Sequence, residues 1–301
     1  MKKILAFGEI IWDVYPDASA IGGAALNFAA HVTASGGAAY LFSAVGEDSL
    51  GDKAIDEISG FGINTSFIKR SDRQTGRCDV SLDKNGVPSF KVIEDTAYDN
   101  IRITERDIAE IRAISPDVLY FGTLIQRGEV SRASLARLIS ECSFGEIVCD
   151  INLRKNCYDR DSAQLCLKKA TILKLSDEEE PLLRELGLYR VEGDSHAAIA
   201  RAICESYKNV RTVLLTLGGN GSFIYESETG EHFYVAAKPA RVASTVGAGD
   251  SYVAAFLVSY LSGAGLKRSA ELASTVSGYV VAHTEAVPSY TLRGGEIVNN
   301  E

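Results

Sequence analysis

The 301-residue sequence lacks long apolar runs and clusters of basic residues. No stretch reaches the ~20 apolar residues that a membrane-spanning helix requires. The start does not resemble a secretory signal, because its short apolar run is followed by Glu9 and Asp13 and by no small-residue cleavage site. With 40 acidic against 31 basic side chains, the chain should be repelled by nucleic-acid backbones. We therefore expect a cytoplasmic protein with no membrane and no nucleic-acid partner.

Cysteine-based sites and several nucleotide-binding signatures are also missing. None of the six cysteines forms a Cys-x-x-Cys pair or lies near a pair of histidines, which indicates reduced thiols rather than a zinc or redox centre. The sequence has no Gly-Lys pair for a P-loop, no His-Arg-Asp or Asp-Phe-Gly set, and no Gly-x-Gly-x-x-Gly after the first apolar run. These absences argue against P-loop enzymes, protein kinases and dehydrogenases.

Short β-branched runs alternate with amphipathic stretches, which predicts β-α units on a parallel sheet. Strands are expected at 3–11, 40–45, 118–122, 147–150, 172–175 and 213–217. Helices are expected at 24–35, 49–61, 105–114, 129–142, 162–170, 195–207, 249–262 and 267–284. No repeat or linker divides the chain, so we expect a single domain over residues 1–301.

Two segments break this alternation. Residues 76–82 and 87–92 are short alternating runs on either side of Asp83-Lys84-Asn85-Gly86, and Asn-Gly is a strong hairpin signal. Together with the stretch 12–20 they could form a small antiparallel sheet that covers a pocket as a lid, spanning about 12–20 and 74–96. An ordinary edge hairpin explains the pattern equally well. An exposed edge on such a sheet could also pair across a two-fold axis, which leaves a homodimer open.

The most informative motif is Ser-Thr-Val-Gly-Ala-Gly-Asp at 244–250, which leads into a helix of small residues. A helix start presents unpaired N–H groups and partial positive charge, so the backbone of Gly247, Ala248 and Gly249 can bind an anion. Asp250 stands beside them, where a carboxylate can take the proton of an attacking hydroxyl while phosphate is transferred. Asp250 could instead be a helix cap, but capping alone does not require two glycines.

Two separated motifs carry a family resemblance. The first is Gly-Gly-Ala-Ala-Leu-Asn-Phe-Ala at 22–29, followed by Gly36 and Gly46, and the second is Thr-Val-Gly-Ala-Gly-Asp at 245–250. Together they resemble the ribokinase-like (PfkB-type) carbohydrate kinases, and fructokinases most closely. The stretches 8–13, 97–101 and 150–154 are similar to fructokinases too, so the resemblance covers nearly the whole chain. It implies an α/β fold, a three-layer α/β/α sandwich with a mainly parallel central sheet and a small β lid.

The resemblance also implies roles for individual residues. The expected substrate-binding residues are Asp13, Gly22, Gly23, Asn27 and Arg154. The expected ATP-binding residues are Asp150, Asn152, Thr216, Gly218, Gly219, Gly221 and Thr245, and Glu179 is expected to hold Mg²⁺ through water. Without the resemblance, Asp13 would be read as a turn residue, Asn27 as a polar helix residue, Arg154 as a surface arginine, and the 218–221 turn as a plain hairpin.

Two positions depart from the family pattern. Ser244 replaces an Asp that usually helps to bind a monovalent cation, so activation by K⁺ is doubtful. Ser176 replaces the Asn of an Asn-x-x-Glu motif linked to magnesium, and only Glu179 is kept. Ser176 and Glu179 could instead form a capping box, although Pro181 should start the helix after Glu180.

These observations lead us to expect an ATP-dependent kinase that phosphorylates a hydroxyl of a ketohexose, fructose being the leading acceptor. A kinase for another sugar, a sugar acid or a nucleoside is one alternative. A sugar-binding regulator without turnover is another, supported by Ser244 and Ser176 and opposed by the intact Asp250 motif. The motifs leave the exact sugar and the oligomeric state open.

Overall fold

A computed structural model describes residues 1–15, 18–82 and 88–299 of the chain, and a nine-stranded sheet forms its centre. The strand order is β13-β12-β11-β10-β9-β8-β1-β4-β5. All neighbours from β11 to β5 run parallel, whereas β12 pairs antiparallel with both β11 and β13. The strands are β1 (Lys3–Phe7), β4 (Ala38–Gly46), β5 (Ile68–Ser71), β8 (Val118–Gly122), β9 (Glu146–Asp150), β10 (Ile172–Ser176), β11 (Thr212–Thr216), β12 (Ser222–Glu226) and β13 (His232–Val235).

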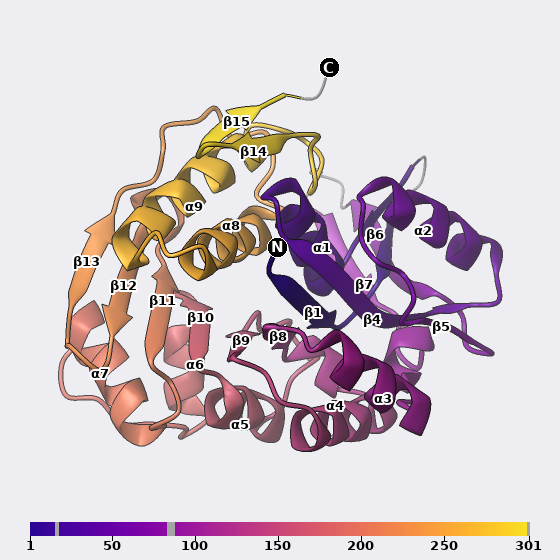
Figure 1. The fold of residues 1–301 in the computed structure, drawn as a ribbon, viewed down its shortest axis with the longest axis horizontal. Helices are drawn as coiled ribbons and strands as arrows, with labels where there is room; N and C mark the ends of the chain where they lie inside the picture. The colour runs from indigo at the N-terminus through magenta and orange to yellow at the C-terminus, as the bar shows by residue number, and fades with distance from the viewer. Residues whose placement is uncertain (16–17, 83–87, 300–301) are drawn as a thin grey trace.

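Helices cover both faces of this sheet (Figure 1). One face carries α1 (Ala24–Ala34), α2 (Ser49–Gly60), α8 (Ala248–Leu261) and α9 (Leu266–Val280), and the other carries α3 (Glu105–Ile114), α4 (Glu129–Glu141), α5 (Arg160–Lys169), α6 (Glu180–Glu185) and α7 (His196–Ser206). Successive residues of β1 alternate between the two hydrophobic cores, since Leu5 and Phe7 enter one and Ile4 and Ala6 the other. The predicted three-layer α/β/α sandwich is confirmed.

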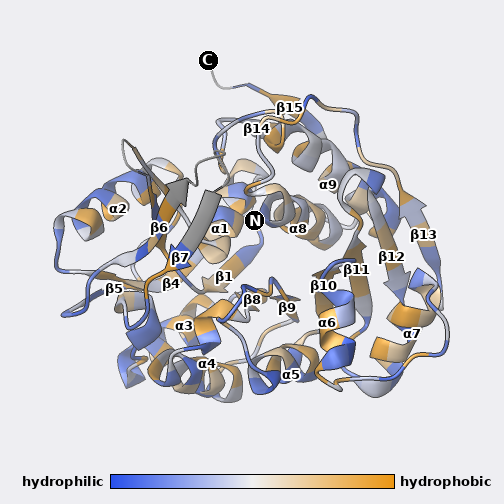
Figure 2. Cartoon of the chain, turned by 180° about the vertical axis from the view of Figure 1, so that it is seen from behind, coloured by the Kyte–Doolittle hydropathy of each residue, from blue (hydrophilic) through white to orange (hydrophobic). Residues whose placement is uncertain are grey.

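The outer helices are amphipathic, and Figure 2 shows polar and apolar residues side by side along α3 to α7. Their apolar residues, such as Ile108 and Ile111 of α3, pack against the sheet. Among the described helices, none combines the length and the hydropathy that crossing a bilayer demands.

A separate four-stranded sheet has the order β3-β2-β6-β7, with β3 at Ser19–Gly22, β2 at Ile11–Val14, β6 at Gly76–Leu82 and β7 at Pro88–Val92. The expectation of a wholly antiparallel sheet was wrong, because β2 and β6 pair in parallel. Such a pair needs a long connection, and the chain between β2 and β6 provides one through α1, β4, α2 and β5. β6 and β7 pair antiparallel, as the hairpin signal predicts, whereas the Asn-Gly turn at 83–87 lies outside the described residues.

The strand expected at 3–11 is divided into two. β1 ends at Phe7 and β2 begins at Ile11, so the chain passes from the main sheet to the small sheet within a few residues. Gly8 lies at this crossing, where a Cβ would stand 2.3 Å from the Cβ of Ala25 in α1. A side chain at Gly8 would therefore push α1 away from the sheet.

Three short 3₁₀ helices, η1 (Ala97–Asn100), η2 (Leu124–Gln126) and η3 (Gly218–Asn220), complete the main elements together with the hairpin β14 (Thr291–Arg293) and β15 (Glu296–Val298). η1 covers most of the stretch 97–101, and its Asp99 accepts bonds of 2.7 and 2.8 Å from the Arg127 guanidinium. This pair, in which Asp99 is buried and Arg127 half-buried, fixes the chain that follows the small sheet.

Candidate active site

The start of α8 has the geometry of an anion-binding site. Gly247 precedes the helix with a left-handed φ of 79°, and a Cβ there would stand 2.3 Å from the carbonyl oxygen of Ala286. The Ala248 amide makes a 3.3 Å bond to Thr245, whereas the amides of Gly249 and Asp250 have no acceptor within the described part of the chain. Two amides at the positive end of the helix dipole are therefore available to a ligand.

Asp250 is the third residue of α8 and is 9% exposed. It does not cap the helix, because Gly247 holds the cap position and no side chain bonds there. Instead, Nδ2 of Asn27 donates a hydrogen bond of 2.9 Å to Oδ2 of Asp250. Burial, followed by the charge of Asp150, raises the pKa of Asp250 to about 7, against the opposing effects of Asn27, Lys174 and Arg154. Such a carboxylate is suited to accept a proton near neutral pH.

The start of α1 meets Asp250 from the opposite side of the site. Gly23 precedes α1 with a φ of 111°, and a Cβ there would stand 2.5 Å from the carbonyl oxygen of Glu9. Oε1 of the buried Glu9 accepts a 2.9 Å bond from the Ala24 amide and so holds the beginning of the helix. Burial raises the pKa of Glu9. Gly22, the last residue of β3, pairs with Ile11 and joins the small sheet to α1.

Asp13 and Arg154 approach the same region from β2 and from the loop after β9. Asp13 is half-buried, and burial raises its pKa while the positive charge of Arg154 lowers it. The same guanidinium lowers the pKa of Glu9, Asp150 and Asp250, which places it within electrostatic reach of all four carboxylates. Arg154 is exposed and makes no hydrogen bond or ion pair with any described residue. Its charge therefore remains available to an anionic ligand.

Asp150 ends β9 in a buried cluster of charged residues. Nζ of Lys174 in β10 donates to Oδ1 of Asp150 at 2.9 Å, and both residues are less than 10% exposed. Burial raises the pKa of Asp150 against the effect of Lys174. Lys174 has its pKa raised to about 12 by Asp150 and Glu179, despite burial, so it stays protonated. Sequence reasoning missed Lys174, although a lysine inside an apolar strand was a visible signal.

The Glu179 carboxylate accepts hydrogen bonds from the backbone around this cluster. Its Oε1 accepts from the Leu153 amide and its Oε2 from the Ser176 amide, both at 2.8 Å, and the Glu179 amide donates to Oγ of Ser176 at 3.2 Å. The reciprocal Ser176–Glu179 bonds have the pattern of a capping box, but they lie in the turn before α6, whose cap position is Glu179 and has no side-chain capping bond. α6 begins at Glu180, one residue before the start that Pro181 suggested.

The residues expected to hold magnesium supply carboxylates but no complete cage. No group of three or more His, Cys, Asp or Glu residues in the described ranges is arranged to hold a metal. Glu179 raises the pKa of Asp150, so the two carboxylates are close enough to interact. This set fits Mg²⁺ held mainly by nucleotide phosphates and water, which is how such sites are usually built.

A small cavity of about 10 Å³ lies between these groups and is lined by Glu9, Ala24, Ala25, Tyr120, Gly122, Thr123, Leu124, Asp150 and Asn152. It has room for about one water molecule. Tyr120 stacks on Phe28 with ring centroids 3.8 Å apart, and its buried hydroxyl has no partner among the described residues. Asn152 has a φ of 40°, a value uncommon outside glycine.

The turn predicted to face the nucleotide is η3, which joins the antiparallel strands β11 and β12. It is thus a hairpin, as the simpler alternative held, and Gly221 is required by packing, since a Cβ would stand 2.0 Å from the Val235 carbonyl oxygen. Gly218 and Gly219 are exposed and have open space where a Cβ would be. Thr216 is half-buried below them, and Thr245 is exposed at the approach to α8.

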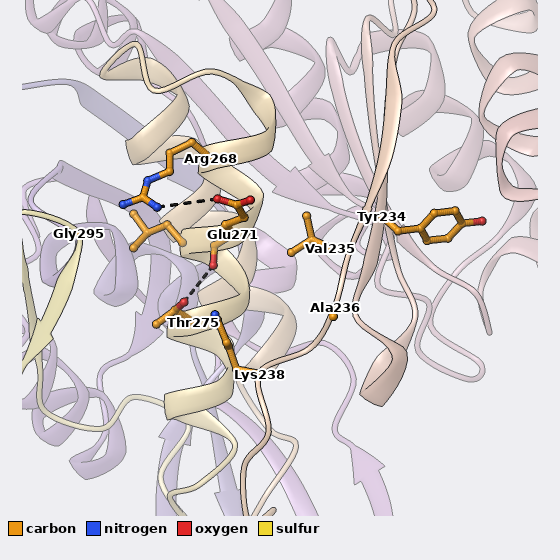
Figure 3. A pocket seen from close by; sticks show the side chains of 9 residues that line it. Tyr234, Val235, Ala236, Lys238, Arg268, Glu271, Thr275 and Gly295 are labelled. Atoms are coloured by element: carbon orange, nitrogen blue, oxygen red, sulfur yellow. Dashed lines mark hydrogen bonds and ion pairs between the residues drawn. The ribbon is translucent and has the colours of Figure 1, made fainter.

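A larger pocket of about 330 Å³ is lined by Tyr234, Val235, Ala236, Lys238, Arg268, Glu271, Leu272, Thr275 and Gly295 (Figure 3). The Tyr234 ring points away from it, and Glu271 pairs with Arg268 at 3.8 Å. None of the residues predicted from the sequence lines this pocket. Thr275 nevertheless lies two residues before Ser277, whose hydroxyl donates to the Ala248 carbonyl at 3.1 Å, so α9 connects the pocket to the start of α8.

The site combines an α/β/α sandwich with two helix amides left unpaired by the described residues and a buried carboxylate, an arrangement suited to phosphoryl transfer. The family model described as pfkB family carbohydrate kinase matches residues 1–291, and the chain belongs to this family. The resemblance found in the sequence is thereby confirmed.

Solved structures of related proteins contain nucleotide. An uncharacterized sugar kinase from Pyrococcus horikoshii, solved with ATP, is 26% identical with a TM-score of 0.79 over 94% of each chain. A structure from E. coli solved with ATP and Mg²⁺ has a TM-score of 0.80 and 19% identity over 95% of each chain.

Curated relatives differ in the acceptor that their names specify. A fructokinase-2 from Oryza sativa is 22% identical over 85% of this chain and 79% of its own. A 2-dehydro-3-deoxygluconokinase from Haemophilus influenzae is 24% identical over 95% of this chain and 96% of its own. The names of these two relatives thus specify different acceptors.

Proposed function

We propose that this protein transfers the γ-phosphoryl group of ATP to a primary hydroxyl of a ketohexose, with fructose as the acceptor. The observation that carries this proposal is the contact between Asn27 and Asp250 beside the free amides of α8. It joins the two motifs of the sequence into one site.

Asp250 is the base in this mechanism. Oδ2 is held by Asn27, which leaves Oδ1 to accept the proton of the sugar hydroxyl. As that proton moves to Asp250, the hydroxyl oxygen forms a bond to the γ-phosphorus, and the bond from phosphorus to the leaving oxygen of ADP breaks. The amides of Gly249 and Asp250, assisted by Ala248 and the Gly247 turn, stabilise the negative charge on the transferred group.

The nucleotide phosphates would lie between the start of α8, the 218–221 turn and the ends of β9 and β10. Thr216, Gly218, Gly219 and Gly221 would face the nucleotide together with Thr245, Asp150 and Asn152. Mg²⁺ would neutralise phosphate charge, with Glu179 and Asp150 as the carboxylates nearest to it. We place the nucleotide base in the pocket beside Thr275. The volume of this pocket, about 330 Å³, lies in the range of small-ligand sites.

The sugar would bind between α1 and the four-stranded sheet, where Asp13, Gly22, Gly23 and Asn27 can contact hydroxyl groups. We infer that this sheet, over about 12–20 and 74–96, closes on the sugar as a lid of a single domain and excludes water as a competing acceptor. Three carboxyl groups, those of Glu9, Asp13 and Asp250, lie on this side, and Arg154 is the one cation among the described residues that lowers the pKa of all three. That balance favours a neutral sugar over a sugar acid.

The cellular setting is also part of the proposal. The six cysteines are all unpaired, as expected for a reducing compartment where ATP is available, and we infer a cytoplasmic location.

The test is an ATP-consumption assay with a panel of neutral ketoses and aldoses, a 2-keto-3-deoxy sugar acid and purine nucleosides. Turnover should be highest with fructose, and Asp250→Asn should lower kcat by several orders of magnitude while fructose still binds. Faster turnover with the sugar acid or a nucleoside would assign a different acceptor. Binding of fructose without turnover in the wild-type protein would identify a regulator instead.

A further inference from the structure

Lys174 is a buried cation inside the central sheet. It is the third residue of β10, between Leu173 and Leu175, and it is 7% exposed. Burying a charge in such a strand costs free energy, and an ion pair with Asp150 recovers only part of that cost. An apolar residue at this position would suit the core better, so the lysine requires an explanation beyond stability.

The ammonium group of Lys174 lies directly against the start of α8. Its Nζ is 3.3 Å from the point where a Cβ on Gly249 would stand. Any side chain at residue 249 would therefore crowd the ammonium group. Because residue 249 is a glycine, the Lys174 ammonium group can lie beside the backbone amides of the anion site.

The hydrogen-bonding capacity of Lys174 is not used up by the protein. An ammonium group has three N–H donors. Within the described part of the chain, Asp150 is the one acceptor to which Nζ bonds. Two donors of a buried ammonium group thus remain available, on the same side of the sheet as the two free amides of α8.

We propose that Lys174 is a phosphate-binding residue of the active site, whose ammonium group donates to the transferred phosphoryl group while Asp150 holds it in place. This inference rests on the proposed kinase activity. A point charge at this position neutralises negative charge that the phosphoryl oxygens carry during transfer. The same charge also favours the ionised form of Asp250.

The groups that face Asp250 are Asn27 from α1, Asp150 from β9, Lys174 from β10, Tyr120 from β8 and Arg154 from the loop after β9. Asp150 raises the pKa of Asp250, whereas Asn27, Lys174 and Arg154 lower it. Removing Lys174 should therefore shift the acidic limb of the kcat/KM profile toward higher pH. This shift tests whether the Lys174 charge acts on Asp250, and an unchanged limb would contradict that arrangement.

The experiment is a double-mutant cycle of Lys174→Met and Asp150→Asn, with kcat, the KM values for ATP and sugar, and Tm measured for each protein. Lys174→Met should lower kcat by about 100-fold or more, with little change in the KM for sugar. In the Asp150→Asn background, Lys174→Met should lower kcat again by a similar factor. In that background the loss cannot come from an unpaired carboxylate at residue 150, because the carboxylate has been replaced. Lys174→Arg should retain part of the activity.

Lys69→Met is the matched control, because it removes an ion pair with Asp107 away from the site. It should lower Tm without changing kcat. The proposal is overturned if Lys174→Met has no effect on kcat in the Asp150→Asn background, since Lys174 would then serve only Asp150. If the wild-type protein phosphorylates nothing in the panel, the proposed function fails by itself. Calorimetry then decides on Lys174, because the substitution should weaken binding of ATP but not of adenosine.

Discussion

Nδ2 of Asn27 lies 2.9 Å from Oδ2 of Asp250, a contact between side chains that are 223 positions apart in the chain. Asn27 projects from α1 and Asp250 from the first turn of α8, and the two helices lie side by side on one face of the sheet (Figure 1). The contact orients the carboxylate and leaves Oδ1 of Asn27 without a partner among the described residues. That oxygen can accept a hydrogen bond from a sugar hydroxyl.

The first prediction concerns Asn27→Asp. A second carboxylate next to Asp250 should raise the pKa of Asp250 above about 7, because two like charges disfavour ionisation. kcat/KM should fall at pH 7 and recover partly at pH 9, as measured by initial rates across this range. Asn27→Leu is the control, since it should reduce activity at every pH. A pH profile of Asn27→Asp identical to that of the wild type would show that Asn27 does not contact the base.

The second prediction is a gain in stability from Asp250→Asn. The carboxyl titrates near 3.8 when unfolded and near 7 when folded, so the folded protein binds the proton more tightly. Wild-type stability therefore falls, relative to the variant, as the pH rises from 3.8 to about 7. Urea unfolding at pH 8 should show the variant more stable by up to about 4 kcal/mol, with the difference disappearing near pH 4. A less stable variant at pH 8 would contradict this account.

The third prediction compares two left-handed glycines at opposite ends of α8. Gly247→Ala should destabilise the protein by about 2–4 kcal/mol, because the new Cβ would clash with the Ala286 carbonyl and because alanine disfavours the left-handed φ of this position. Gly263 has a φ of 87° and open space around it, so Gly263→Ala should cost only about 1 kcal/mol. Thermal unfolding measures both, and equal losses would show that the close approach to Ala286 is unimportant.

The fourth prediction concerns His31, which is buried in α1. Its two ring nitrogens contact the Tyr290 hydroxyl and the Ala286 carbonyl, each at 2.9 Å, and burial lowers its pKa from 6.5 to about 4. Because the folded protein resists protonation, His31 contributes stability above pH 6.5 that is lost as the pH falls toward 4. The loss should reach about 3 kcal/mol.

His31→Gln cannot titrate, so the variant should lack this part of the pH dependence in urea unfolding between pH 7 and pH 4. Its kcat should also fall, because Ala286 lies against Gly247 at the start of the anion site. If the free energies of unfolding of the wild type and the variant changed in parallel over the whole pH range, His31 would not be the source of this pH dependence.

The fifth prediction concerns monovalent cations. Oγ of Ser244 accepts a 3.2 Å bond from the Val246 amide, and a serine brings no negative charge to this turn. Replacing Na⁺ with K⁺ at constant ionic strength should therefore leave kcat unchanged. Ser244→Asp should create a preference for K⁺ in the same assay. Strong activation of the wild-type protein by K⁺ would contradict this expectation.

The glycine motifs were predictable from the sequence because their meaning is local. A helix start with glycines at 247 and 249 exposes amides wherever it lies in a fold. The exact bounds of α3 and β8 followed from periodicity in the same way. The strands β5, β14 and β15 escaped prediction, because each is only three or four residues long and contains at least one charged residue.

The contribution of Glu9 and Lys174 could not be assigned from the sequence, because both act through distant partners. Glu9 bonds to the start of α1, and Lys174 reaches α8 only because β9 and β10 are neighbours in the sheet. Strand order decides which side chains meet, and a single sequence does not specify it. A charged residue in an apolar strand was the available signal for Lys174.

The distance along the chain between Asn27 and Asp250 has a consequence for biosynthesis. A ribosome adds about 5–20 residues per second, so the 223 positions between them take roughly 10–45 seconds to translate. During that interval the side of α1 that packs against α8 in the folded protein has no α8 to cover it. This side of α1 therefore stays exposed on the nascent chain until about the last fifth of the sequence, which contains α8, has left the ribosome. A prematurely terminated product would lack Asp250 and could not become active.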